Sequence, residues 1–192
     1  IVPSQQALRD YVPAELPLWM TEFSNTSGVG YGSYDEAMAQ AALMHATFVG
    51  GANLYAVWTF YYPGGPGEAL ISITTNGSGQ YTVHPKFWTA RQYMKYVRAG
   101  AYRIGASSDA EGVKVSAYRN PDGSVVAVFL NESTDPRWAV VEGGALGDPP
   151  RFVRTSPGEN GVELPNESVE RIGGRMLRLP ARSVSTAIWP EE

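Results

Sequence analysis

Glu22 is the residue whose type and position most directly indicate chemistry. It ends the nearly all-apolar run of residues 18–21 and precedes a loop rich in Gly and Ser. Barrel enzymes present catalytic side chains in this way, at the carboxyl end of a parallel strand. Trp58 lies near the end of a second run, followed by Tyr61 and Tyr62. Glu22 is therefore a candidate nucleophile. Sugar rings stack on aromatic faces, so the aromatic content also fits a sugar-binding protein, although core packing accounts for most aromatic residues. The alternatives are a solvated loop carboxylate and a packed core tryptophan.

Alternating strands and helices are expected to position these residues, from the start of the chain to about Val97. Residues 18–21 are typical of a parallel strand buried on both faces, and residues 53–60 form the next strand. Ser33 and Glu36 have capping-box spacing, which assigns Glu36 to the cap of a helix that ends at Gly50-Gly51. Residues 61–67 are too rich in Pro and Gly to be more than a loop.

A second helix is predicted to begin at His84-Pro85, because Pro is favoured at the first helical position. The apolar faces expected at helical period are Ala37, Ala41, Met44 and Phe48 in the first helix, and Phe87, Ala90, Met94 and Val97 in the second.

After Gly100 the pattern changes to short alternating strands. They are expected at residues 113–117, 125–130, 138–141, 176–179 and 183–189, with a turn at 120–123. Val113, Val125 and Phe129 are the expected core residues. Regular turns without helices indicate a β-sandwich. The sequence thus predicts an α/β part at residues 1–99 and an all-β part at residues 100–192.

Composition excludes several classes of function. The net charge of −4 and a pI near 5.3 give no basis for binding nucleic acid or anionic membranes. The absence of Cys excludes disulfides, zinc-thiolate sites and a thiol nucleophile, and no apolar run is long enough to span a membrane. The two histidines are far apart, so we expect no metal site and no cofactor, and His45 is interpreted as structural.

Four segments resemble the C-terminal part of glycoside hydrolase family 30. They are residues 18–22 (Leu-Trp-Met-Thr-Glu), 44–58, 87–104 and 179–186, which occur in the family's order and cover most of the chain. The resemblance implies strands seven and eight of a TIM barrel with their helices, followed by the family's side β-sandwich. It also implies an extracellular retaining enzyme acting on a β-linked glycan such as xylan, β-1,6-glucan or β-1,6-galactan.

The same resemblance assigns roles to individual residues. Glu22 falls on the nucleophile position and Trp58 on the aromatic position at the end of strand eight. Tyr61 and Tyr62 either line a neighbouring subsite or are plain loop residues. The segment after Trp58 lacks the Arg that glucuronoxylanases of the family use to pair with a uronate.

A retaining mechanism needs two carboxyl groups about 5–5.5 Å apart, and the family's acid/base follows an Asn at the end of strand four. That strand is expected upstream of Ile1, so the chain should depend on a missing N-terminal barrel segment and be inactive alone. Asn131-Glu132 and Asn166-Glu167 spell the same dipeptide, but both lie in the β-rich part and are interpreted as turns. Two other functions stay open: a non-catalytic carbohydrate-binding module, and a sandwich that only supports the barrel.

Overall fold

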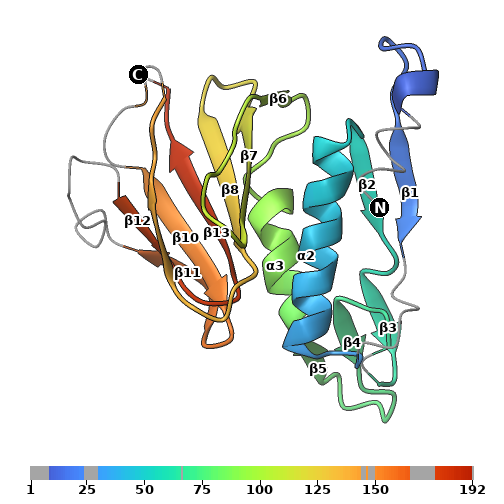
Figure 1. Ribbon diagram of the computed structural model, residues 1–192. Helices are drawn as coiled ribbons and strands as arrows, with labels where there is room; N and C mark the ends of the chain where they lie inside the picture. Colours follow the sequence, from blue (N-terminus) through green and yellow to red (C-terminus); the bar gives the residue numbers. More distant parts are fainter. Residues whose placement is uncertain are drawn as a thin grey trace. The chain divides into compact units, whose positions relative to one another are not determined.

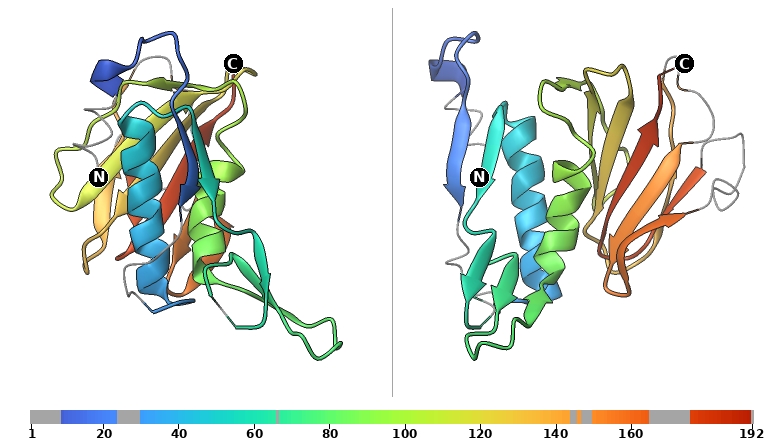
Figure 2. Two further views of the ribbon diagram at one scale, coloured as in Figure 1. Left: turned by 90° about the vertical axis from the view of Figure 1, so that its right-hand side faces the viewer. Right: turned by 180° about the vertical axis from the view of Figure 1, so that it is seen from behind.

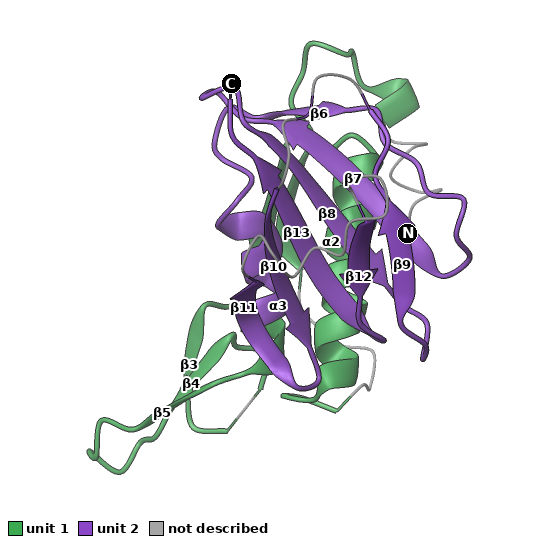
Figure 3. Cartoon of the chain, turned by 90° about the vertical axis from the view of Figure 1, so that its left-hand side faces the viewer, with its two compact units in different colours: residues 1–87 green, residues 88–192 purple. Residues whose placement is uncertain are grey.

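The computed structural model describes residues 9–23, 30–65, 67–143, 146, 150–164 and 176–191. Contacts between residues divide the chain into two units, Ile1–Phe87 and Trp88–Glu192 (Figure 3). Each unit is described separately below. No helix among these described residues has the length and apolar character needed to cross a membrane.

The first unit is built on two parallel strands, β1 (Trp19–Phe23) and β2 (Leu54–Val57). The main chain extends their pairing at both ends: the Asn53 amide donates to the Leu18 carbonyl at 2.7 Å, and the Trp58 amide donates to the Phe23 carbonyl at 3.1 Å. Both strands point toward a small sheet at one end of this unit (Figures 1 and 2). The alternation of strands and helices expected for this part of the chain is therefore confirmed.

Helix α2 (Tyr34–Val49) connects the two parallel strands. It begins as predicted, with the Ser33 hydroxyl accepting the backbone N–H of Glu36 at 3.1 Å. Gly50 is the C-cap, and Gly51 takes a positive φ of 96° that suits a residue without a Cβ. The buried residues lie on more than one side of the helix, including Met38 and Leu43 as well as the predicted Ala37, Ala41 and Met44.

Residues 61–67 depart from the sequence prediction. Tyr61–Pro63 is not loop but strand β3, the edge of a three-stranded sheet with β4 (Ile71–Ile73) and β5 (Tyr81–Val83). β3 pairs with β4 in parallel, and β4 with β5 antiparallel. Tyrosines favour strands, and an edge strand tolerates a proline because its outer side needs no N–H donor. The preceding strand β2 is correspondingly shorter than the predicted 53–60.

The second unit contains a six-stranded antiparallel sheet in the order β11-β10-β13-β8-β7-β6, and a two-stranded sheet of β12 and β9. The strands are β6 (Tyr102–Ile104), β7 (Val113–Arg119), β8 (Val125–Asn131), β9 (Arg137–Val140), β10 (Arg151–Ser156), β11 (Glu159–Leu164), β12 (Met176–Leu179) and β13 (Ser183–Trp189). The expected β-sandwich is confirmed. The hairpin of β10 and β11 was missed, although Pro157-Gly158 between them is a turn signal.

The two sheets enclose one apolar core. It contains the predicted Val113, Val125 and Phe129 together with Leu177 and Leu179 from the smaller sheet. Alternate residues of each strand face it, as a two-layer β structure requires. The predicted turn at residues 120–123 is present, with the Gly123 amide donating to the Asn120 carbonyl at 3.0 Å.

Helix α3 (Pro85–Met94) begins at the predicted proline and buries the predicted Ala90, but the predicted face is only partly correct. Met94 was expected to be buried and is 58% exposed. The buried side instead carries Gln92, which donates to the Thr155 hydroxyl of β10 at 2.8 Å and accepts from the Thr186 hydroxyl of β13 at 2.7 Å. The helix therefore docks on the large sheet through hydrogen bonds, which apolar periodicity does not reveal.

This docking affects where the chain divides. Most of α3 belongs to the second unit, because residue contacts divide the chain after Phe87. The sequence boundary was placed where the strand pattern begins, because the pattern carries no information on which unit the helix packs against.

Candidate functional site

Glu22 lies near the carboxyl end of β1, where the strand contains an irregularity. Met20 pairs with Tyr55 and Phe23 with Val57, so two residues of β1, Thr21 and Glu22, stand opposite one residue of β2. This two-against-one register is a β-bulge, a feature that redirects a side chain and is common next to active sites. Thr21 and Glu22 are both exposed. The carboxylate is thus presented outward at a strand end.

Trp58 follows the end of β2 directly. Its backbone N–H donates to the carbonyl of Phe23, the residue after Glu22, so the ends of the two strands are joined at this point. The peptide bond between Trp58 and Thr59 is cis. The indole is half exposed, with 51% of the residue accessible. Glu22 and Trp58 therefore lie at the same edge of the parallel pair, as the sequence predicted.

Tyr61 and Tyr62 lie on strand β3, just past Trp58, and both are exposed. The register of the small sheet places Tyr61 in line with Ile71 and Val83, and Pro63 in line with Ile73 and Tyr81. Tyr81 is exposed as well. The segment from Thr59 to Val83 carries one charged residue, Glu68. Beyond the strand ends, the chain thus presents exposed aromatic rings and hydroxyl groups with a single acidic residue nearby in the sequence.

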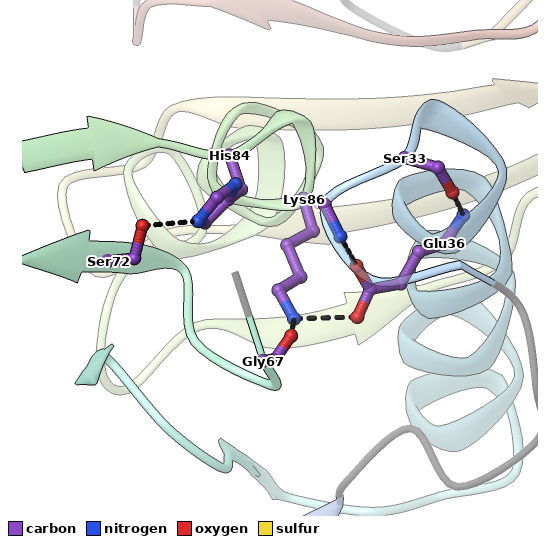
Figure 4. A network of polar contacts seen from close by, with 7 residues as sticks. Ser33, Glu36, Gly67, Ser72, His84 and Lys86 are labelled. Atoms are coloured by element: carbon purple, nitrogen blue, oxygen red, sulfur yellow. Dashed lines mark hydrogen bonds and ion pairs between the residues drawn. The ribbon is translucent and has the colours of Figure 1, made fainter. Parts of the chain in front are cut away.

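Glu36 has a second role besides the helix cap that the sequence predicted. The cap is made by the hydroxyl of Ser33, while the Glu36 carboxylate is buried and forms an ion pair with Lys86. Its other oxygen accepts the backbone N–H of Gly32 at 2.7 Å. The first turn of α2 also favours a negative charge, because the helix N-terminus is the positive end of its dipole. Figure 4 shows this network.

His84 lies beside this ion pair and contacts Ser72 of β4, with its Nε2 atom 3.0 Å from the hydroxyl oxygen. Burial lowers the pKa of His84, the positive charge of Lys86 lowers it further, and Glu36 opposes them. The ring is consequently neutral near pH 7 and links β4 to the start of α3 (Figure 4). From the sequence, His84 was interpreted only as part of the helix start, and this contact with Ser72 was not predicted.

The other candidates from the sequence lie away from the strand ends. Asn131 ends β8 and its amide donates to the carbonyls of Asp135 and Pro180, while Glu132 forms an exposed ion pair with Lys114. This dipeptide thus shapes a turn of the sandwich. Asn166-Glu167 lies outside the described residues. His45 is buried within α2. Across the described ranges, no three His, Asp or Glu side chains are grouped to hold a metal ion.

Comparison with known proteins supplies the context for this geometry. The chain is similar in fold to a GH30 endoxylanase from Clostridium papyrosolvens C71, with a TM-score of 0.77 and 21% identity over 100% of this chain and 46% of that one. It is also similar to a conserved exported protein from Bacteroides fragilis, with a TM-score of 0.79 and 19% identity over 97% of this chain and 42% of that one.

An endo-β-1,6-glucanase matches with a TM-score of 0.72 and 16% identity over 99% of this chain and 39% of its own. The chain spans less than half the length of these three solved structures. Residues 100–187 match the Glycosyl hydrolase family 30 beta sandwich domain. The predicted resemblance and fold class are thereby confirmed: residues 100–187 are similar to the family 30 β-sandwich domain, and the chain along its length shares the fold of part of these solved structures.

Proposed function

We propose that this chain is the C-terminal portion of a retaining glycoside hydrolase and supplies its nucleophile, Glu22. The observation that carries the proposal is the exposed carboxylate on a bulge at the carboxyl end of β1, joined through Phe23 to the strand end that bears Trp58. Catalytic residues of barrel enzymes lie at this end of the strands. Similarity to a xylanase and a glucanase supports the reaction class.

In the proposed reaction, the Glu22 carboxylate attacks the anomeric carbon of a β-glycoside. The bond from that carbon to the leaving-group oxygen breaks, and a carboxylic acid elsewhere in the enzyme protonates that oxygen. The resulting glycosyl ester on Glu22 is then cleaved by water, deprotonated by the same second carboxyl group, and the β configuration is restored. We place this second group on barrel sequence that precedes the chain, which is the partner that Glu22 requires.

The proposed substrate is a neutral β-linked glycan, such as unsubstituted xylan, β-1,6-glucan or β-1,6-galactan. Trp58 offers an aromatic face for the sugar nearest the cleaved bond, and Tyr61 and Tyr62 line a neighbouring subsite. A substrate bearing uronates would need an Arg or Lys partner, and the segment from Thr59 to Val83 contains neither. Export from the cell is part of the proposal, supported by similarity to an exported protein.

The test replaces Glu22 in the protein that includes the upstream sequence. Glu22→Gln keeps the size of the side chain and removes its nucleophilic oxygen, so turnover of xylan or β-1,6-glucan should fall by at least about a hundredfold. Glu132→Gln is the matched control, because Glu132 is an exposed carboxylate that also follows an Asn. Its turnover should stay within about twofold of the wild type, as expected for a surface position.

Covalent trapping gives a second, independent readout. A 2-fluoro-substituted glycoside with an activated leaving group slows hydrolysis of the ester intermediate, so the peptide that contains Glu22 should gain the mass of one sugar. Labelling of a different carboxylate, or more than about a hundredth of wild-type turnover in Glu22→Gln, contradicts the assignment.

A further inference from the structure

Glu36 and Lys86 form a buried ion pair in which each partner also holds a backbone group of a different loop. The Lys86 Nζ atom lies 2.7 Å from Glu36 Oε1, and both residues are 2% exposed. The second carboxylate oxygen accepts the N–H of Gly32 at 2.7 Å. On the other side, the Lys86 ammonium donates to the carbonyl of Gly67 at 3.5 Å. The contacts are drawn in Figure 4.

Both of these backbone groups belong to connections that follow proposed site residues in the chain. Gly32 belongs to the connection that follows β1 and therefore follows Glu22. Gly67 belongs to the connection between β3 and β4, which follows Tyr61 and Tyr62. The pair joins residues 50 positions apart in the chain. It thus connects Gly32, which follows the proposed nucleophile in the chain, with Gly67, which follows the proposed sugar-binding tyrosines.

Stability is a weak explanation for such a pair. Removing two charges from water costs free energy that their mutual attraction barely offsets, and apolar residues of similar volume often serve the core equally well. What apolar side chains cannot do is accept from the N–H of Gly32 or donate to the carbonyl of Gly67. The ionic pair therefore specifies loop geometry rather than merely filling space.

We propose that Glu36 and Lys86 are positioning residues that fix the two loops relative to each other and so determine how an extended glycan lies along Tyr61 and Tyr62. This inference rests on the proposed function. Neither residue touches the sugar in this proposal. Their loss should weaken use of long substrates, which span both loops, more than use of a small aryl glycoside, which occupies the position beside Glu22 and Trp58.

The experiment compares two substrates in the protein that includes the upstream sequence: an aryl β-glycoside and a neutral oligosaccharide of at least five sugars. The variants are Glu36→Gln, which leaves Lys86 charged and buried, and the double variant Glu36→Leu/Lys86→Met, which restores an apolar core. In both, kcat/KM for the oligosaccharide divided by kcat/KM for the aryl glycoside should fall roughly tenfold, mainly through KM, since small misplacements of binding groups have large kinetic effects.

The exposed pair Lys114–Glu132 provides the matched control. Lys114→Met/Glu132→Leu removes an ion pair of similar length on the sandwich, and the substrate ratio should not change. Thermal unfolding of each variant sets an assay temperature at which all are folded. A double variant that folds and keeps the wild-type ratio overturns the positioning role. Absence of any glycosidase activity in the wild type would instead overturn the proposed function, so the two failures are distinct.

Discussion

At the scale of single residues, two carboxylates of the first unit have opposite environments. Glu22 is exposed on a bulge, whereas Glu36 is buried and compensated by Lys86 and a backbone N–H. A nucleophile must reach a substrate, and a buried carboxylate must be paired because an isolated charge in the interior is costly. Environment, not residue type, separates the proposed catalytic glutamate from the proposed positioning glutamate.

His84 gives a pH prediction at the same scale. Burial and Lys86 lower its pKa in the folded protein, with Glu36 opposing, while in the unfolded chain it returns to about 6.5. The unfolded state therefore binds the proton more readily. This contribution to stability is complete above about pH 7 and is lost as the pH falls through 6.5 toward the lower folded value.

The measurement is urea unfolding of the wild type and His84→Gln between about pH 5.5 and 7.5. Gln keeps a hydrogen-bonding group near Ser72 but does not titrate, so the free energy of unfolding of the variant should fall less steeply toward low pH. If the free energies of unfolding of the two proteins changed with pH in parallel, His84 would not be the source of the pH dependence.

At the scale of elements, the docking of α3 on the large sheet depends on polar side chains. Gln92, Thr155 and Thr186 are all fully buried, and the Gln92 side chain is hydrogen-bonded to both threonine hydroxyls. A buried polar group without a partner costs free energy, so these three side chains must be matched in position. The arrangement fixes the helix relative to strands β10 and β13 more specifically than an apolar contact would.

Gln92→Leu tests this contact. It removes one hydrogen bond from each threonine hydroxyl, while their bonds to the backbone remain. At about 0.5–1.5 kcal/mol for each bond, the free energy of unfolding should fall by about 1–3 kcal/mol. Met94→Ala, on the exposed side of the same helix, is the control and should change stability by less than about 0.5 kcal/mol. Both values come from denaturant unfolding of the complete protein. Equal effects of the two substitutions would contradict the polar docking.

At the scale of the whole molecule, the chain is short compared with the solved structures that share its fold, and its parallel sheet contains only the strands β1 and β2 within the described residues. The solved structures are more than twice its length. A two-stranded parallel sheet leaves strand edges unpaired, and such edges are normally covered. Unpaired edges thus support the proposal that Glu22 acts within a larger barrel that supplies further strands and the second carboxyl group.

The prediction at this scale concerns the 192-residue chain alone. It should give no detectable turnover of an aryl β-glycoside under conditions in which the protein with its upstream sequence is active, because one carboxyl group cannot supply both nucleophile and acid. Near-ultraviolet circular dichroism should first verify that its buried aromatic residues, such as Trp189, are packed. A normal rate from the folded chain would show that the acid/base lies within it.

The sequence by itself determined the features that depend on neighbouring residues. The Ser33 cap, the helix start at Pro85, the turn at residues 120–123 and strands β12 and β13 were all predictable, because caps, turns and strand alternation are local signals. Local signals also placed Glu22 and Trp58 at strand ends, which is why the candidate site could be proposed before the fold was known.

Only the tertiary structure decided the features that depend on distant partners. The bulge at Glu22 exists only in the register of β1 against β2, strand β3 exists only because β4 lies beside it, and Glu36 meets Lys86 across 50 residues. The polar face of α3 is likewise defined by the sheet that it contacts. Such pairings leave no periodic pattern in the chain, because the free energy that selects them comes from burial and hydrogen bonding between segments rather than within them.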